Sequence, residues 1–155
     1  MDDSVARSIA KWPNVPAVYG WLELDRRGNW RIKGERIANV ALRDFIARNY
    51  ERDARGCWFF QNGPQRVFVR LAYTPLVVHY EGEALFDHCG RPFAARETFV
   101  DDEGSVLVVD EGKIALLDDR DLARFAETGE RLPRLAKSEI ATRFGFIAEP
   151  SDSLR

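Results

Sequence analysis

The sequence is poor in histidine and cysteine, with two residues of each among its 155. Two histidines exclude a His-rich metal site. Cys57 and Cys89 lack the spacing of a zinc ribbon and are too few for a disulfide framework. No apolar run approaches the roughly 20 residues that a membrane helix needs. The first residues are acidic and no apolar signal core follows them, so we expect a cytoplasmic protein with free thiols and no membrane partner.

Several catalytic signatures are also missing. The sequence contains no G-x-G-x-x-G after a predicted strand, no P-loop and no H-E-x-x-H. Dinucleotide redox chemistry and nucleotide hydrolysis are therefore disfavoured, because each needs one of these phosphate-binding loops. We assign no catalytic residue from the sequence and expect no cofactor.

Charge is distributed unevenly along the chain, although the net charge is only −2. Residues 1–80 carry 13 Lys and Arg against 8 Asp and Glu, whereas residues 81–155 carry 10 against 17. Such asymmetry is typical of a nucleic-acid-binding part beside an acidic part, or of two halves that compensate each other. The positive residues are scattered rather than clustered, which favours compensation.

Hydrophobic periodicity predicts an α+β fold in which antiparallel hairpins pack on one main helix. The helix is predicted over residues 39–52, with Asn39 as its N-cap. Its apolar stripe is formed by Leu42, Phe45, Ile46 and Tyr50. Short runs that alternate between polar and apolar residues predict strands elsewhere, and the C-terminal half is strand-rich.

The same pattern predicts the domain organisation. We expect residues 1–155 to form a single compact unit. Within it, residues 15–74 form an α+β subdomain and residues 75–128 a mostly β subdomain. Residues 129–155 form a C-terminal helical tail.

One turn phrase recurs in the sequence. It spans Asp25–Ile32, Asp53–Phe60 and, in weaker form, Asp101–Val108. An aspartate opens the turn, a glycine three residues later takes the left-handed conformation, and the following strand begins. In the two clear copies this strand begins near Trp30 and Trp58, which we interpret as core anchors of the hairpins.

Three phrases carry a family resemblance: the runs Val15–Trp21, Gly28–Ile37 and Trp58–Val67. Over residues 15–128 the chain resembles a group of small conserved proteobacterial proteins known only as a domain of unknown function. More distantly, it is similar to a second uncharacterised family with a Gly-x-Trp hairpin, a helix and a strand-rich C-terminal half. The resemblance implies two small packed subdomains. It implies no activity, cofactor or catalytic residue.

Ligand-type side chains concentrate between residues 79 and 90. The candidate metal ligands are His79, Asp87, His88 and Cys89, because imidazole, carboxylate and thiol together suit zinc or a similar ion. Alternatively, Cys89 is a nucleophile with His79 as its base, although no nucleophile motif surrounds it. A third interpretation is an exposed hairpin with a surface histidine at each end.

Polar residues interrupt two apolar strands at a predicted turn. The candidate partner-binding residues are Gln61, Asn62, Gln65 and Arg66. Their amides suit a peptide backbone or a sugar. They suit equally the turn's own backbone groups, which is the interpretation we favour.

A basic, aromatic surface for single-stranded nucleic acid is a further hypothesis. Its rings and guanidinium groups would come from Trp21, Trp30, Trp58, Phe59, Phe60, Phe68, Arg31, Arg36, Arg66 and Arg70. However, the rings occupy alternating positions that a core also uses, and the pI is near 5.8. Nucleic acid is therefore a disfavoured partner.

Taken together, these patterns favour a non-enzymatic cytoplasmic binding or interaction module. Its partner is an unidentified protein or small molecule, or a second copy of the chain paired through an edge strand. One alternative is a small metal-dependent or thiol enzyme that uses the His79, His88 and Cys89 region. The other is single-stranded nucleic-acid binding through Arg and Trp residues of the N-terminal half.

Overall fold

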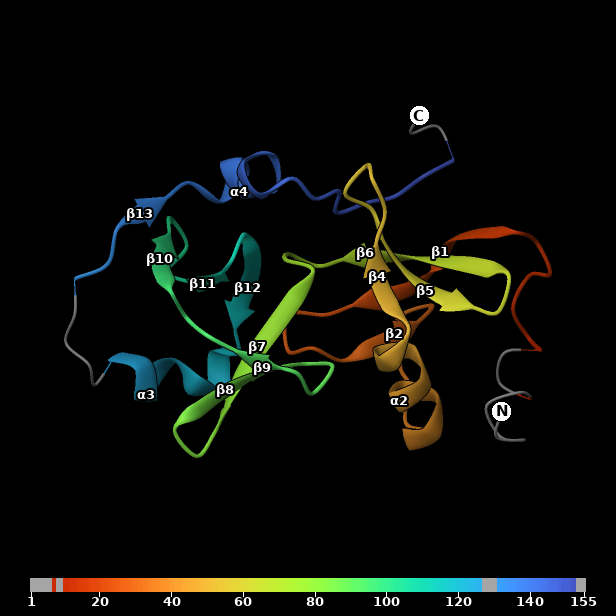
Figure 1. Cartoon of the computed structure of the whole chain (residues 1–155), viewed down its shortest axis with the longest axis horizontal. Helices are drawn as coiled ribbons and strands as arrows, with labels where there is room; N and C mark the ends of the chain where they lie inside the picture. Colours follow the sequence, from red (N-terminus) through yellow and green to blue (C-terminus); the bar gives the residue numbers. More distant parts are fainter. Residues whose placement is uncertain (1–6, 8–9, 127–130, 153–155) are drawn as a thin grey trace. The chain divides into compact units, whose positions relative to one another are not determined.

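A computed structural model describes residues 7, 10–126 and 131–152 of the chain, and its strands form two sheets (Figure 1). The chain divides into two units, each with one sheet. The first unit comprises residues 1–25, 29–72 and 147–155, and the second comprises residues 26–28 and 73–146. Three α-helices lie in the described residues, so the fold is α+β with mostly strands.

The first unit contains a six-stranded sheet in the order β3-β2-β1-β6-β5-β4. Neighbouring strands are antiparallel except β1 and β6, which run parallel. Such a pair needs a long crossover connection, here one that contains a helix and four further strands. The strands are β1 (Ala17–Leu24), β2 (Trp30–Ile32), β3 (Glu35–Arg36), β4 (Tyr50–Arg52), β5 (Trp58–Asn62) and β6 (Gln65–Leu71).

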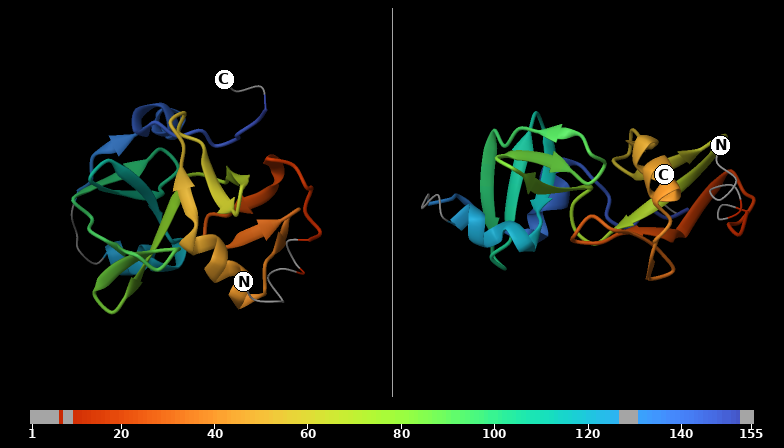
Figure 2. Two further views of the ribbon diagram at one scale, coloured as in Figure 1. Left: turned by 45° about the vertical axis from the view of Figure 1, so that its right-hand side comes forward. Right: turned by 90° about the horizontal axis from the view of Figure 1, so that it is seen from below.

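Helix α2 (Val40–Arg48) packs on this sheet (Figures 1 and 2). The predicted cap is confirmed, because Asn39 Oδ1 accepts a hydrogen bond from Leu42 N at 3.0 Å. Phe45 of the helix meets Phe60 of the sheet edge to face, with ring centroids 5.3 Å apart. These contacts bury one side of α2 against the strands.

The predicted helix over 39–52 is too long. Its last residues, Tyr50–Arg52, form β4 and pair with β5. Tyr50 is 3% exposed, and its ring meets that of Trp30 at 4.9 Å. Tyr50 is therefore a buried residue, as its place in the predicted apolar stripe indicated, but it lies on strand β4 and not on the helix.

The second unit contains a seven-stranded sheet in the order β13-β10-β11-β12-β7-β8-β9. Strands β7 and β12 are parallel, as are β10 and β13. The sequence predicts antiparallel hairpins, but both sheets contain parallel pairs as well. The strands are β7 (Leu76–Glu81), β8 (Ala84–Asp87), β9 (Pro92–Phe93), β10 (Glu97–Asp101), β11 (Val106–Asp110), β12 (Lys113–Leu117) and β13 (Arg134–Leu135).

The second unit has its own helices, so packing of all hairpins on one main helix is not confirmed. They are a 3₁₀ turn η1 (Asp119–Asp121), α3 (Leu122–Ala126) and α4 (Lys137–Phe144). Helix α4 buries Ile140 completely. The expected helical tail over 129–155 thus contains α4, while residues 129–130 and 153–155 of that prediction lie outside the described part.

After α4 the chain returns to the first unit. Ile147 forms a parallel bridge with Cys57, and Ile147 N donates to Gly56 O at 2.9 Å. Leu71 N donates to Ala148 O at 2.8 Å. The end of the described chain is therefore a structural part of the first unit.

The predicted Asp-x-x-Gly turn is confirmed at Asp25, Asp53 and Asp101, and a fourth copy occurs at Asp87. In each, the aspartate backbone N donates to the carbonyl four residues ahead at 2.8–3.0 Å. The carboxylate of each accepts the backbone N–H of that same later residue at 2.8–3.0 Å. The glycines have φ between 81° and 87°. One local device therefore builds four hairpins.

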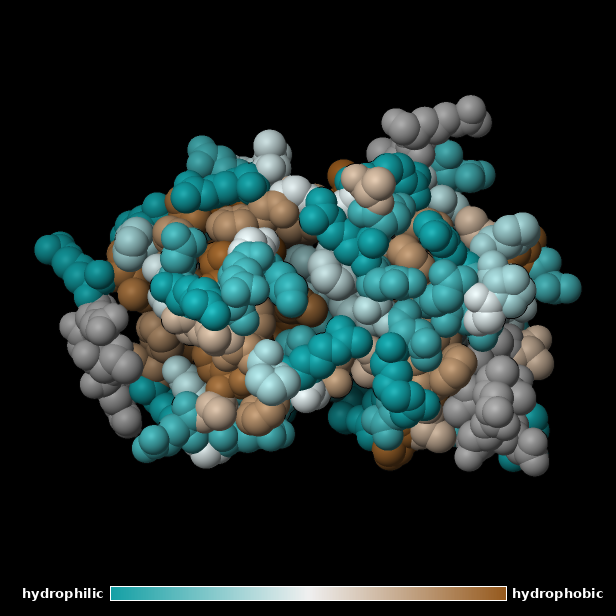
Figure 3. Space-filling model, in the orientation of Figure 1, coloured by the Kyte–Doolittle hydropathy of each residue, from teal (hydrophilic) through white to brown (hydrophobic). Residues whose placement is uncertain are grey.

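The tryptophans that follow two of these turns lie in the interior. Trp30 is 3% exposed. Trp58 is half-buried, with its ring 4.9 Å from that of Tyr50. Hydrophilic side chains dominate the face of the first unit seen in Figure 3, and Val15 and Val40 are the exposed large hydrophobic residues of the described chain. None of the described helices has the length and apolar character to cross a membrane.

Candidate functional site

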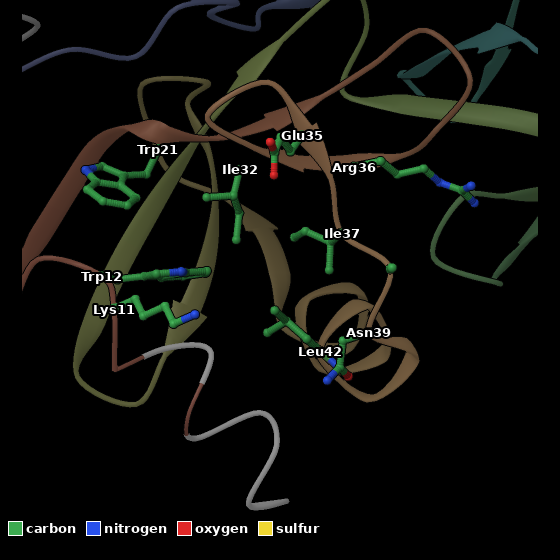
Figure 4. A pocket seen from close by; sticks show the side chains of 10 residues that line it. Lys11, Trp12, Trp21, Ile32, Glu35, Arg36, Ile37, Asn39 and Leu42 are labelled. Atoms are coloured by element: carbon green, nitrogen blue, oxygen red, sulfur yellow. The ribbon is translucent and has the colours of Figure 1, made fainter.

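A hollow of about 480 Å³ opens in the first unit. Three parts of the chain form it: the segment before β1, the strands β1 to β3, and the start of α2 (Figure 4). We call it the tryptophan pocket. Its lining residues are Lys11, Trp12, Trp21, Ile32, Glu35, Arg36, Ile37, Ala38, Asn39 and Leu42.

The walls of the tryptophan pocket are apolar. Trp12 and Trp21 stand on one side, and Ile32, Ile37 and Leu42 fill the space between the strands and α2 (Figure 4). Trp12 is only 7% exposed. Large, rigid rings beside aliphatic side chains are typical of surfaces that bind apolar molecules.

The rim of the tryptophan pocket is polar. Lys11 and Arg36 are exposed there, together with Glu35. The ammonium of Lys33 lies over the Trp21 ring, 4.4 Å from its centroid, although Lys33 itself is outside the lining. The rim therefore combines an excess of positive charge with a single carboxylate.

An amide network fixes the segment that carries Lys11 and Trp12. Gln65 Nε2 donates to Pro13 O at 2.7 Å and to Val15 O at 2.8 Å. Asn62 Nδ2 donates to Gln65 Oε1 at 3.0 Å, which orients the Gln65 amide. Gln65 is thus a positioning residue for one wall of the pocket and is not part of its lining.

The other predicted partner-binding residues also serve the chain itself. Gln61 Nε2 donates to Gly63 O at 2.6 Å and Gln65 O at 3.2 Å. The Arg66 guanidinium lies 4.4 Å from the centroid of the Phe59 ring. The Gln61 amide thus bonds within its own hairpin, whereas Arg66 packs on an aromatic ring.

The arginines of the nucleic-acid hypothesis have intramolecular partners as well. Arg31 Nε donates to Asp25 at 2.9 Å, and Arg70 pairs with Glu149 at 3.1 Å. Arg36 lies apart from them, at the rim of the tryptophan pocket. Since Trp30 is buried, its ring is not available to stack on a base.

A second hollow, of about 380 Å³, lies in the second unit and brings His79 and His88 together. It does not include Asp87 or Cys89. Its remaining lining residues are Arg27, Gly28, Tyr80, Asp118, Arg120 and Asp121.

The charged groups around this second hollow are paired with one another. Asp118 binds the Arg120 guanidinium at 2.6 Å, and Asp121 accepts the backbone N–H of Tyr80 at 3.0 Å. Arg27 pairs with Asp119 at 2.9 Å. Burial raises the pKa of Asp118, but the hydrogen bonds from Arg120 outweigh burial and hold it below its usual value. The network joins the turn that carries Arg27 and the strand that carries Tyr80 to the segment after β12.

The predicted metal ligands His79, Asp87 and His88 make hydrogen bonds or polar contacts with other parts of the chain. Val77 N donates to His88 Nδ1 at 3.2 Å, so the ring proton is assigned to Nε2, and neither nitrogen has a lone pair to offer a metal. His79 Nε2 contacts Glu81 at 3.2 Å. Asp87 accepts the backbone N–H of Cys89 at 2.9 Å within its own turn. The described residues contain no group of three or more His, Cys, Asp or Glu suited to hold a metal ion.

The thiol of Cys89 is poorly suited to be a nucleophile. Burial, together with the nearby Asp87 carboxylate, raises its pKa to about 12. Burial also raises the pKa of Cys57, which is fully buried. At neutral pH both side chains are therefore protonated thiols.

We expect both thiols of the native protein to react slowly with a thiol-specific chromogenic reagent at pH 7.5. The expected rate is at most about one tenth of that in denaturant, because the attacking species is the thiolate. Stopped-flow absorbance measures the two rates, and Cys57→Ser and Cys89→Ser assign the signal. A fast native phase that disappears in Cys89→Ser would restore the thiol-enzyme hypothesis.

Comparison with known proteins gives a family and a fold. Residues 1–140 match the model of the DUF2944 family, described as "Protein of unknown function (DUF2946)". No curated protein matches the chain. Crystal structures of two DUF1285 family proteins are similar in fold. The protein from Silicibacter pomeroyi DSS-3 has a TM-score of 0.55 and 17% identity, over 82% of this chain and 85% of that one. The protein from Shewanella baltica OS155 has a TM-score of 0.51 and 14% identity, over 68% and 90%.

Proposed function

Since the chain belongs to this family, whose description assigns no activity, we propose its function from geometry: it is a non-enzymatic binding protein that takes a small, largely apolar molecule into the tryptophan pocket. The observation that carries the proposal is the pair of rings, Trp12 and Trp21, that face a hollow also lined by four aliphatic side chains.

The size and lining of the tryptophan pocket support a small-molecule ligand. Its volume of about 480 Å³ lies within the range of about 300–1,000 Å³ that is usual for ligand pockets. Such pockets combine apolar walls with a few polar groups that orient the ligand. Here Lys11, Glu35, Arg36 and Asn39 supply those groups.

The chemistry of the same residues favours binding over catalysis. The lining contains no histidine, cysteine or serine, and its one amine, on Lys11, is exposed to solvent. Its single carboxylate, Glu35, is exposed on a two-residue edge strand. A binding protein needs no such set, whereas an acid–base enzyme does.

Sheet edges give less support to self-association. In the described chain the edge strands β3, β4, β9 and β13 span two or three residues each. Short edges offer few unpaired backbone groups to a second copy. We therefore propose a small-molecule partner rather than edge-to-edge pairing. The two free thiols suit the reducing cytoplasm that the proposal assumes.

Titration with the neutral fluorophore N-phenyl-1-naphthylamine tests the proposal, because its emission rises when it enters an apolar pocket. We expect saturable one-to-one binding. In Trp21→Ala the affinity should fall about tenfold or more, as is common for a buried aromatic contact. The matched control is Tyr19→Ala, which removes a ring from the same strand but outside the pocket.

A second variant reaches the tryptophan pocket indirectly. Gln65→Ala removes the bonds to Pro13 and Val15, so it should weaken binding by a few-fold without touching the lining. Gln61→Ala is its control, because that amide bonds only within its own turn. If the wild-type protein does not bind the probe saturably, or if Trp21→Ala binds it as well as wild type does, the proposal fails.

A further inference from the structure

We infer that the ligand of the tryptophan pocket is an apolar acid: a molecule with an apolar body and one oxyanion group, such as a carboxylate or sulfonate. This inference rests on the proposed function and adds the charge of the ligand to it. It is carried by the groups at the rim, by the direction of their hydrogen bonds and by the position of Lys33.

Positive charge exceeds negative charge around the tryptophan pocket. Lys11 and Arg36 line it and are exposed on long, flexible stems, and the Lys33 ammonium lies directly over the Trp21 ring. Glu35 is the one acidic residue of the lining. In Figure 4, the Lys11 side chain lies beneath Trp12 with its ammonium toward the hollow, whereas the Arg36 side chain extends from the opposite side, away from the other labelled residues. A head group on the Trp12 side of the mouth therefore faces a cation.

The hydrogen-bonding groups at the rim also favour an anionic ligand. The Oδ1 atom of Asn39 already accepts from Leu42 N at 3.0 Å, so the NH₂ end of that amide is left to donate to a ligand. Lysine and arginine side chains only donate. The rim thus offers three donating side chains against one accepting carboxylate, and a ligand rich in acceptors is the complement.

A cationic ligand would also meet the charge of Lys33. The face of a tryptophan ring attracts cations, and the Lys33 ammonium already lies over the Trp21 ring, 4.4 Å from its centroid. The turn that holds it has Lys33 at φ 51°, a conformation uncommon outside glycine, and Lys33 N donates to Trp21 O at 3.2 Å. A second cation would be repelled by Lys33 and would have Glu35 as its one acidic neighbour in the lining.

Three 1-naphthylamine fluorophores test the inference, and the neutral and anionic ones share the same N-phenyl body. They are neutral N-phenyl-1-naphthylamine, anionic 8-anilinonaphthalene-1-sulfonate and cationic N-(1-naphthyl)ethylenediamine. At low salt we expect the anion to bind about tenfold more tightly than the neutral probe, and the cation to bind most weakly. Raising the salt concentration should weaken the binding of the anion and leave the affinity for the neutral probe unchanged.

A charge-matched pair of double variants locates the effect. Lys11→Gln with Arg36→Gln should lower the affinity for the anion about tenfold and change that for the neutral probe less than about twofold. The control, Arg48→Gln with Lys113→Gln, changes the net charge equally but lies outside the pocket. It should leave both affinities unchanged.

The outcomes separate the two proposals. Equal affinity for the neutral and anionic probes, or tightest binding of the cation, would overturn the inference about ligand charge. Neither result would contradict the proposed binding function. An equal loss in both double variants would also overturn it, because the field of the whole chain, rather than the rim, would then attract the anion. If none of the probes binds saturably, the proposed function fails first.

Discussion

Replacing Gly28 by alanine is expected to destabilise the folded protein by about 2–4 kcal/mol. Two costs add at this position. Gly28 has φ 81°, which is unfavourable for any residue with a Cβ atom. A Cβ there would also lie 2.7 Å from His88 Cβ, closer than side-chain atoms approach, and 3.6 Å from Val77 Cβ. Since the nearest atom is the Cβ at the root of the half-buried His88 side chain, the turn itself must move.

Gly104→Ala is the matched control for this prediction. Gly104 occupies the same position in another Asp-x-x-Gly turn, with φ 86°, but a Cβ there would meet nothing within 4 Å. It should therefore cost only the backbone term of about 1–2 kcal/mol. Urea unfolding followed by far-UV circular dichroism gives both values. Equal losses would show that the approach of Gly28 to His88 carries no energetic weight.

The second large effect is expected at Asp101, which is fully buried. Its Oδ1 accepts the backbone N–H groups of Glu103 at 2.9 Å and Ser105 at 2.8 Å, and its Oδ2 accepts the Tyr73 hydroxyl at 2.9 Å. Asp101→Ala leaves these three donors without their acceptor in the interior. We expect a loss of about 3–5 kcal/mol, since each such group costs about 1–3 kcal/mol.

A double-mutant cycle with Tyr73→Phe isolates one of these bonds. Burial and the Asp101 carboxylate raise the pKa of Tyr73, so its hydroxyl stays protonated and donates. Tyr73→Phe alone should cost about 1.5–3 kcal/mol, because it removes a hydrogen bond to a charged group. Added to Asp101→Ala, it should cost much less, because the hydroxyl has already lost its acceptor. Strictly additive losses, measured by the same urea titrations, would contradict a direct bond between the two side chains.

How much of this fold could be predicted from the sequence depends on how local each feature is. The Asp-x-x-Gly turns and the Asn39 cap were predictable, because four or five consecutive residues determine their hydrogen bonds. The fourth turn was missed at Asp87, because His88 and Cys89 inside it suggested metal ligands. A carboxylate that opens a turn and one that binds a metal look alike in sequence.

Features that join distant segments were not predictable. The parallel pairing of β1 with β6 and of β7 with β12 depends on which hairpins meet, and no local pattern encodes that choice. Tyr50 kept the spacing of a helix stripe while packing from a strand.

The tryptophan pocket was missed for the same reason. Sequence reasoning named Trp21 and Arg36, but for base stacking, and it gave no role to Lys11 or Asn39 in binding. One signal was available: unlike Trp30 and Trp58, neither Trp12 nor Trp21 follows the glycine of an Asp-x-x-Gly turn. These two rings therefore do not anchor an Asp-x-x-Gly hairpin.

The return of the chain after α4 has a consequence for biosynthesis. Leu71 and Gly56 find their hydrogen-bond partners at Ala148 and Ile147, which are translated some ninety residues after Gly56. A nascent chain on the ribosome therefore cannot complete the first unit before residues 147 and 148 have been translated. Cys57 and its aromatic neighbours therefore stay unshielded by Ile147 until that residue has emerged from the ribosome. A chaperone that binds the nascent chain is expected to bind it in that interval.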